Sequence, residues 1–182
     1  MKKKIIALVG MPGCGKTVAV KAAKEKSIPV VSMGDVVREE VKVRGLEENP
    51  ENLSKISKGL REEEGPQAVA NRTLPKIERE KSSIVLVEGI RSLEEVEFFK
   101  RHYPDFTLVA IHASPETRFK RLCKRERADD SLDIKTFQER DNREIGFGLG
   151  AVMALADYVI VNEGSEEELI ENMRVILGKI IK

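Results

Sequence analysis

One octapeptide near the N-terminus constrains the fold of this chain more than any other feature. Residues 10–17 read Gly-Met-Pro-Gly-Cys-Gly-Lys-Thr, which fits the pattern G-x-x-x-x-G-K-[ST] of a phosphate-binding loop (P-loop). A β-rich run over residues 5–9 precedes the loop, and a helical pattern rich in Ala and Lys follows it. Backbone N–H groups of such a loop point inward, and the helix N-terminus adds positive potential. The motif therefore predicts a strand–loop–helix unit that binds nucleotide phosphates.

The residue types within the loop predict separate roles. Lys16 is expected to bridge the β- and γ-phosphates of ATP, and the Thr17 hydroxyl is expected to ligate Mg²⁺. Cys14 is either a reactive thiol or, as we favour, a filler whose backbone N–H is what matters. The positions expected to contact the nucleotide through this unit are Gly10, Met11, Pro12, Gly13, Cys14, Gly15, Lys16, Thr17 and Val18.

Short apolar runs without polar alternation recur along the chain and are separated by helical patterns. They cover residues 5–9, 29–32, 84–87, 106–111 and 158–161. Continuous apolar runs are typical of parallel strands buried on both faces, and strand–helix alternation predicts helices on both sides of the sheet. We therefore predict an α/β fold, a P-loop NTPase three-layer sandwich with a five-stranded parallel sheet. Ser165 and Glu168 form a predicted capping box for a C-terminal helix.

The length of 182 residues predicts one P-loop kinase-like domain over residues 1–182. About fifty residues separate the second and third predicted strands and hold three helical patterns, a length that is typical of a functional insertion. We interpret residues 34–80 as an inserted helical subdomain that binds the acceptor. Residues 121–143, which are dense in arginine, are interpreted as a short lid.

Composition excludes several classes of protein. The net charge is +1 and aromatic residues make up 4% of the chain, whereas general nucleic-acid binders carry a basic excess or stacking aromatics. No apolar run approaches the roughly 20 residues that span a bilayer. The two cysteines, Cys14 and Cys123, make no disulfide framework. We therefore expect a cytoplasmic protein that acts on a small molecule, with no membrane or nucleic-acid partner, and the oligomeric state stays open.

Charged residues follow the ends of neighbouring predicted strands, where open α/β sheets bind ligands. Arg38 and Arg91 are expected to hold an acceptor phosphate bidentately. Glu88 ends a strand and is either a Mg²⁺ ligand through water or a helix-capping carboxylate. Arg61 and Arg72 are either acceptor contacts or, as the alternating charges favour, part of a solvated face.

Two motifs resemble the acceptor site of nucleoside monophosphate kinases, adenylate kinase above all. They are Ser32-Met33-Gly34-Asp35-Val36-Val37-Arg38 and Glu88-Gly89-Ile90-Arg91. Residues 121–130 resemble the arginine-bearing lid, and residues 156–165 resemble the base-side loop of related kinases, including dephospho-coenzyme A kinase. The chain is also similar to an archaeal family of adenylate-kinase-related P-loop proteins.

The resemblance implies roles for residues in each of these segments. Arg121 and Arg125 would act on the transferring group, and Arg125 would also bind ATP together with Asn162 and Gly164. Arg127, Arg140 and Arg143 are further candidates in the lid. The implied substrate contacts are Ser32, Gly34, Asp35, Arg38, Glu88, Gly89, Arg91 and Glu95. Glu95 stands where adenylate kinases carry a glutamine that reads adenine.

We predict a phosphotransferase that uses ATP and Mg²⁺, with Thr17 and Glu88 as metal ligands, and that acts as a nucleoside monophosphate kinase. Two alternatives stay open. One is transfer to a hydroxyl, as in dephospho-coenzyme A kinase, which needs a carboxylate base such as Asp35. The other is a regulatory NTPase that acts on a macromolecular partner.

Overall fold

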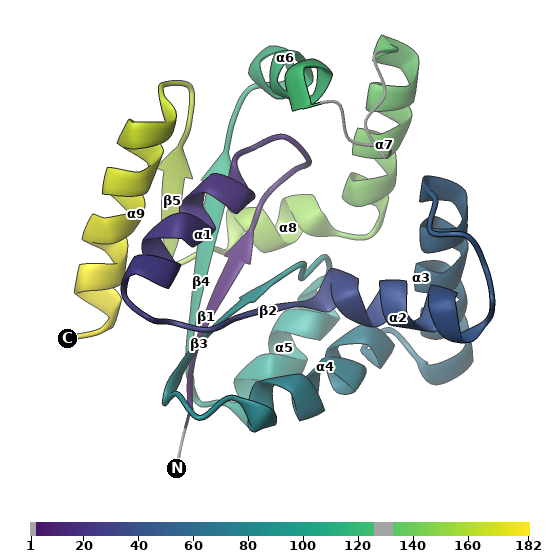
Figure 1. The fold of residues 1–182 in the computed structure, drawn as a ribbon, viewed down its shortest axis with the longest axis horizontal. Coiled ribbons are helices and arrows are strands. Elements are labelled where there is room, and N and C mark those ends of the chain that lie inside the picture. Colours follow the sequence, from purple (N-terminus) through teal and green to yellow (C-terminus); the bar gives the residue numbers. More distant parts are fainter. Residues whose placement is uncertain (1–2, 126–132) are drawn as a thin grey trace.

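Five parallel strands form a single sheet in the computed structural model, which describes residues 3–125 and 133–182 (Figure 1). The strands are β1 (Lys4–Val9), β2 (Val30–Ser32), β3 (Ile84–Glu88), β4 (Asp105–His112) and β5 (Tyr158–Val161). Their order across the sheet is β2-β3-β1-β4-β5, and every neighbouring pair is parallel. The predicted α/β fold with a five-stranded parallel sheet is confirmed.

Helices cover both faces of this sheet (Figure 1). They are α1 (Lys16–Glu25), α2 (Met33–Val43), α3 (Pro50–Glu64), α4 (Ala68–Arg79), α5 (Leu93–His102), α6 (Pro115–Arg125), α7 (Ile134–Gly146), α8 (Leu149–Ala154) and α9 (Glu166–Ile180). Ser165 and Glu168 form the predicted capping box at the start of α9. None of the helices in the described parts of the chain is both long and apolar enough to cross a membrane.

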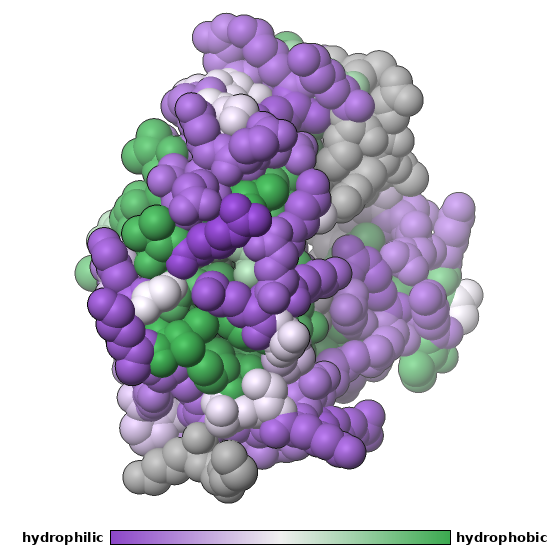
Figure 2. Space-filling model, turned by 60° about the vertical axis from the view of Figure 1, so that its left-hand side comes forward, coloured by the Kyte–Doolittle hydropathy of each residue, from purple (hydrophilic) through white to green (hydrophobic). Residues whose placement is uncertain are grey.

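Two apolar cores lie on opposite faces of the sheet because successive side chains of a strand point to opposite sides. Ile6 and Leu8 of β1 pack with α1 and α9. Ile5, Ala7 and Val9 pack with α2, α3, α4, α5 and α8. A space-filling view of one side of the molecule shows a mainly hydrophilic surface with apolar patches (Figure 2).

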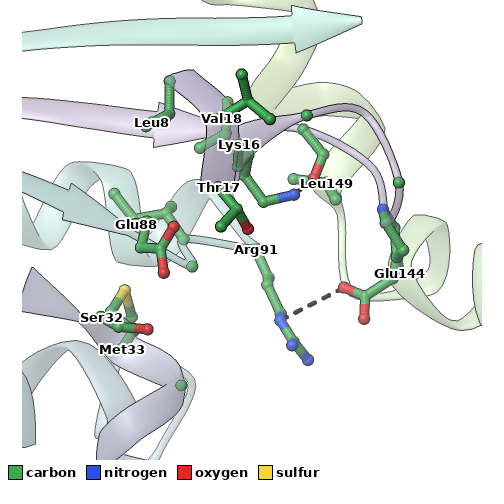
Figure 3. Close-up of a pocket in the computed structure, with 18 of the residues that line it drawn as sticks. Leu8, Lys16, Thr17, Val18, Ser32, Met33, Glu88, Arg91, Glu144 and Leu149 are labelled. Carbon is green, nitrogen blue, oxygen red and sulfur yellow. Dashed lines mark hydrogen bonds and ion pairs between the residues drawn. The ribbon is translucent and has the colours of Figure 1, made fainter. Parts of the chain in front are cut away.

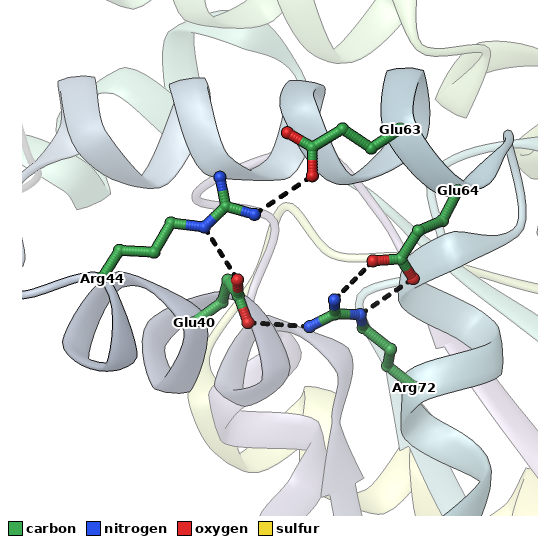
Figure 4. Close-up of polar contacts among 5 residues, drawn as sticks. All are labelled: Glu40, Arg44, Glu63, Glu64 and Arg72. Carbon is green, nitrogen blue, oxygen red and sulfur yellow. Dashed lines mark hydrogen bonds and ion pairs between the residues drawn. The ribbon is translucent and has the colours of Figure 1, made fainter.

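The predicted insertion consists of α2, α3 and α4, which share the core of the sheet rather than enclosing one of their own. Charged side chains tie the three helices together (Figure 4). Glu40 on α2 accepts from Arg44 at 2.8 Å and from Arg72 on α4 at 2.7 Å. Arg72 also donates to Glu64 on α3 through Nε at 3.0 Å, and Arg44 reaches Glu63 at 3.2 Å. Arg72 therefore belongs to an ion-pair network between helices.

Candidate functional site

A cavity of about 560 Å³ opens at the carboxyl ends of β1, β2 and β3 (Figure 3). This volume lies in the usual range of small-molecule sites. The predicted site residues that line it are Gly10, Pro12, Gly13, Gly15, Lys16, Thr17, Val18, Ser32, Gly34, Arg38, Glu88, Gly89, Arg91, Arg121, Asn162 and Gly164. Four described candidates lie outside the lining, namely Met11, Cys14, Asp35 and Glu95.

The P-loop connects β1 to α1 and wraps one end of the cavity. Gly15 has φ +107°, and a Cβ there would lie 2.5 Å from the amide nitrogen of Asn162, so this position requires glycine. Lys16 Nζ folds back to donate to the carbonyl of Gly10 at 2.5 Å and of Met11 at 3.3 Å. The loop thus holds its lysine over its own concave side, where a chain of phosphates would lie.

The Thr17 hydroxyl and the Glu88 carboxylate both line the cavity and are oxygen donors that could hold Mg²⁺ (Figure 3). Glu88 ends β3 and pairs in register with Leu8 of β1, next to the start of the P-loop. It forms no ion pair with any other described residue. Hard oxygen donors of this kind suit Mg²⁺ when phosphate oxygens complete its shell.

Asn162, in the loop between β5 and α9, supports the P-loop from a distant part of the sequence. Its side chain is 5% exposed, and Nδ2 donates to the Cys14 carbonyl at 2.8 Å. Arg121 on α6 donates to the carbonyls of Asn162 and Gly164, at 3.0 Å each. The three residues therefore form one wall at the nucleotide end of the cavity.

Arg118 on α6 was not singled out from the sequence, because an arginine in a charged helix gives no signal of burial. Its side chain is buried and donates to the Pro12 carbonyl at 3.1 Å and to Asp141 on α7 at 2.8 Å. It therefore links the P-loop to both helices of the predicted lid. The Arg125 side chain and Arg127 lie outside the described residues.

Three arginines approach the opposite end of the cavity, which faces α2, α3 and α7. Arg38 pairs with Asp35 at 2.7 Å and with Glu48 at 3.2 Å. Arg91 Nε lies 3.4 Å from Glu144 on α7 (Figure 3). Arg61 also lies at this end, since it shares Glu95 with the backbone of Arg91. Arg140 lines the cavity, whereas the exposed Arg143 does not. The position of Arg61 agrees with the acceptor contact that the sequence analysis gave as the less favoured alternative, and Glu144 is an addition that carried no signal in the sequence.

Two expectations for single side chains need correction, those for Asp35 and Glu95, whereas the filler role favoured for Cys14 agrees with its burial. Asp35 is exposed, outside the cavity and paired with Arg38, so it is not placed to act as a base. Glu95, in the first turn of α5, is fully buried and accepts from Arg61 and from the backbone N–H of Arg91, so it does not face an acceptor base. Cys14 is fully buried in the core between α1 and the sheet, where a thiol acts as a small apolar filler. Met11, though outside the lining, still offers its carbonyl to Lys16.

Comparisons with known proteins agree with this architecture. Residues 9–138 match the model of a family described as an AAA domain. A UPF0200 protein of Methanocaldococcus jannaschii is 51% identical over 179 residues, which cover 97% of this chain and 90% of that protein. A UPF0200 protein of Hyperthermus butylicus is 48% identical and covers 97% of this chain and 94% of its own length.

Solved structures share the fold at low sequence identity. TT1252 from Thermus thermophilus superposes with a TM-score of 0.69 at 18% identity and covers 98% of both chains. A shikimate kinase from Bacteroides thetaiotaomicron gives 0.66 at 19% identity, with 96% of this chain and 98% of that chain covered. A gluconokinase from Sinorhizobium meliloti gives 0.60 at 13% identity, with 98% and 94% covered. The chain therefore has a P-loop kinase-like fold.

Proposed function

Because this chain belongs to the UPF0200 family and to the family described as an AAA domain, and has a kinase-like fold, we propose that it is a phosphotransferase that uses Mg-ATP. Its acceptor is a small anionic molecule, and the acceptor class that we favour is a nucleoside monophosphate. The reaction would convert ATP and a nucleoside monophosphate to ADP and a nucleoside diphosphate.

The observation that carries the proposal is the continuity of one cavity between two cationic ends. The P-loop with Lys16 lines one end, and Arg38, Arg61 and Arg91 line the other. Phosphoryl transfer depends chiefly on positioning and on neutralising charge on the transferred group. A cavity with cations at both ends can hold the anionic groups of a donor and of an acceptor facing each other.

The residues at the nucleotide end would bind and orient the donor. Backbone N–H groups of the P-loop would hold the β-phosphate, and Lys16 would leave the loop carbonyls to reach the γ-phosphate. Thr17 and Glu88 would hold Mg²⁺, which neutralises charge on the phosphate oxygens when bound. Val37, Ile90 and Leu149 line the cavity and would exclude water from the transferring group.

The arginines at the other end would bind and orient the acceptor. Guanidinium groups bind phosphate oxygens through paired N–H donors, which fixes both the position and the angle of the phosphate. A phosphate monoester is already ionised near neutral pH, so its oxygen needs no general base for attack. This agrees with the outward position of Asp35.

Glu88 favours a second candidate, a kinase with a hydroxyl acceptor. Its carboxylate lines the cavity without an ion-pair partner among the described residues. It could therefore accept the proton of an attacking hydroxyl instead of holding the metal. The sequence analysis assigned this base to Asp35. Because Glu88 lines the cavity and Asp35 does not, Glu88 is the better candidate for the base.

Turnover of Mg-ATP with each of AMP, GMP, CMP, UMP, dCMP and dephospho-coenzyme A tests the proposal, with products identified by mass. A diphosphate formed from a monophosphate, lost in Arg91→Ala and kept in Arg101→Ala, is the expected result. Arg101 is the control because it is an exposed arginine outside the cavity. A product phosphorylated on a hydroxyl supports the second candidate. Phosphate release at one slow rate with every acceptor contradicts both and indicates a regulatory NTPase.

A further inference from the structure

Arg61 and Arg91 converge on the same buried groups although they come from different elements. Arg61 lies on α3, and Arg91 lies in the loop after β3. Both oxygens of the fully buried Glu95 are used: Oε1 accepts from Arg61 Nη2 at 2.6 Å, and Oε2 accepts from the backbone N–H of Arg91 at 2.8 Å. The Phe147 ring lies 5.4 Å from Arg61 Cζ and 5.9 Å from Arg91 Cζ. One carboxylate and one ring therefore set the relative positions of the two residues.

Each guanidinium keeps donors for a ligand. A guanidinium has five N–H donors. Arg61 Nη1 donates to the carbonyl of Ser57 at 2.8 Å and to its hydroxyl at 2.6 Å, and Nη2 donates to Glu95. This leaves Nε–H and one Nη2 hydrogen. Among the residues that the structure describes, Arg91 pairs with a carboxylate only through Nε, toward Glu144, and its two Nη groups extend past that contact (Figure 3). Arg91 also lines the cavity.

Arg38 differs from Arg61 in burial and from both arginines in its partners, whereas the Arg91 side chain is 36% exposed. The Arg38 side chain is 44% exposed, and two exposed or half-exposed carboxylates, Asp35 and Glu48, bind it. The Arg61 side chain is 14% exposed and already held in place. Charge-assisted hydrogen bonds are stronger where water is excluded, and a preset side chain loses less conformational entropy when a ligand binds.

We propose that Arg61 and Arg91 form the subsite for the phosphate monoester of the acceptor, and that Arg38 lies at its solvent edge. Arg61 thus takes the place that the sequence motif assigned to Arg38, and Glu95 is the positioning residue that holds both arginines. This subsite rests on the proposed function, because it assumes an acceptor that carries a phosphate.

Inorganic phosphate is the probe, because it tests the subsite without a known substrate. The protein is first saturated with Mg²⁺ and the β,γ-imido analogue of ATP, so that the P-loop and the γ-phosphate position are filled. Phosphate binding is then measured by calorimetry. We expect Arg61→Lys to weaken binding by about tenfold or more, because lysine keeps a charge for Glu95 but loses the fork. Arg38→Met is expected to change binding by less than about threefold.

A second variant guards against misfolding. In Arg61→Lys the shorter side chain could leave the buried Glu95 carboxylate without its partner, which would destabilise the protein. The double variant Arg61→Met/Glu95→Gln avoids this, because it removes both buried charges together. It should bind the ATP analogue as the wild type does and lose phosphate binding. In turnover, Arg61→Lys should raise the KM for the monophosphate and leave the KM for ATP unchanged.

The subsite is overturned if Arg38→Met loses phosphate while the Arg61 variants bind it normally, or if the wild type with the analogue binds no phosphate. If phosphate binding depends on Arg61 but no monophosphate is turned over, the phosphate subsite is supported and the proposed function is contradicted. The two hypotheses therefore fail by different results.

Discussion

Asn162 shows how much a single residue from a distant segment contributes to the P-loop. Its amide donates to the Cys14 carbonyl, 148 positions away in the sequence, and it closes the space that a side chain at position 15 would need. Arg121 holds the loop after β5, which carries Asn162, by donating to the carbonyls of Asn162 and Gly164. The conformation of the phosphate-binding loop is therefore held by the loop after β5 as well as by its own glycines.

We predict that Asn162→Ala destabilises the folded protein by about 1–3 kcal/mol, because the buried carbonyl of Cys14 loses its donor. The affinity for Mg-ADP should fall in parallel. Urea unfolding gives the stability, and calorimetry gives the affinity. Asn172→Ala, an exposed position on α9, is the matched control and should change neither. An Asn162→Ala protein with wild-type stability and nucleotide affinity would show that the P-loop holds its shape alone.

At the level of elements, the helices of the insertion are joined by charge as well as by apolar packing. Arg72 bridges α4 to Glu40 on α2 and to Glu64 on α3 (Figure 4). Hydrogen bonds from Arg44 and Arg72 lower the pKa of Glu40, and the hydrogen bond from Arg72 lowers the pKa of Glu64. The network joins α3, which carries Arg61, to α2 and α4.

We predict that Arg72→Met lowers the free energy of unfolding at pH 7 by about 1 kcal/mol, because partly exposed ion pairs contribute little each. The pKa values of the two glutamates are depressed in the folded state, so their contribution is present above their ordinary value of 4.5 and is lost as the pH falls through the lower folded values. The difference between Arg72→Met and wild type should therefore shrink below pH 4.5.

Urea unfolding at several pH values measures this difference. Lys58→Met, which removes one exposed pair with Glu62 within α3, is the control and should change stability less at every pH. A deficit of Arg72→Met that is as large in acid as at pH 7 would mean that lost packing, not charge, causes it.

At the scale of the whole molecule, the strand order creates the cavity. β1 lies in the centre of the sheet, with β3 and then β2 on one side of it. The carboxyl ends of these three strands lead into the P-loop, the Glu88–Arg91 loop and α2. The residues proposed to bind donor and acceptor thus lie at one edge of the sheet, where open α/β sheets bind ligands.

Because ligand binding favours the folded state, we predict that ADP with Mg²⁺ stabilises the protein by about 2.7 kcal/mol at a hundred times its Kd. Chelation of Mg²⁺ should remove part of this gain, and Thr17→Val should remove the same part, since it lacks the hydroxyl ligand. Urea unfolding with ADP, with and without a chelator, measures both. Equal stabilisation with and without Mg²⁺ would contradict a metal site at Thr17.

Local sequence patterns determined the strands, the P-loop and the cap of α9. Residues 5–9 and 158–161 were predicted as strands buried on both faces because they are continuous apolar runs. Both form strands, but β5 lies at the edge of the sheet, and its Val159 and Val161 are 56% and 63% exposed. The octapeptide and the Ser165–Glu168 box act over a few positions, so spacing alone identifies them. The resemblance to adenylate kinase stays a prediction, and so does its assignment of Arg38.

Only the tertiary structure decided the strand order and the composition of the acceptor end of the cavity. Whether an arginine faces solvent or a cavity depends on how its helix packs, and neighbouring residues in the sequence do not report that packing. Arg61 and Arg72 occupy similar charged patterns, yet one lines the cavity and the other joins helices. Asp35 and Glu95 were likewise assigned by resemblance to kinase motifs, but in the folded chain the first is exposed and the second is fully buried. The residues of the P-loop can thus be identified from a short stretch of sequence. Which charged side chains line the cavity depends instead on how distant elements pack together.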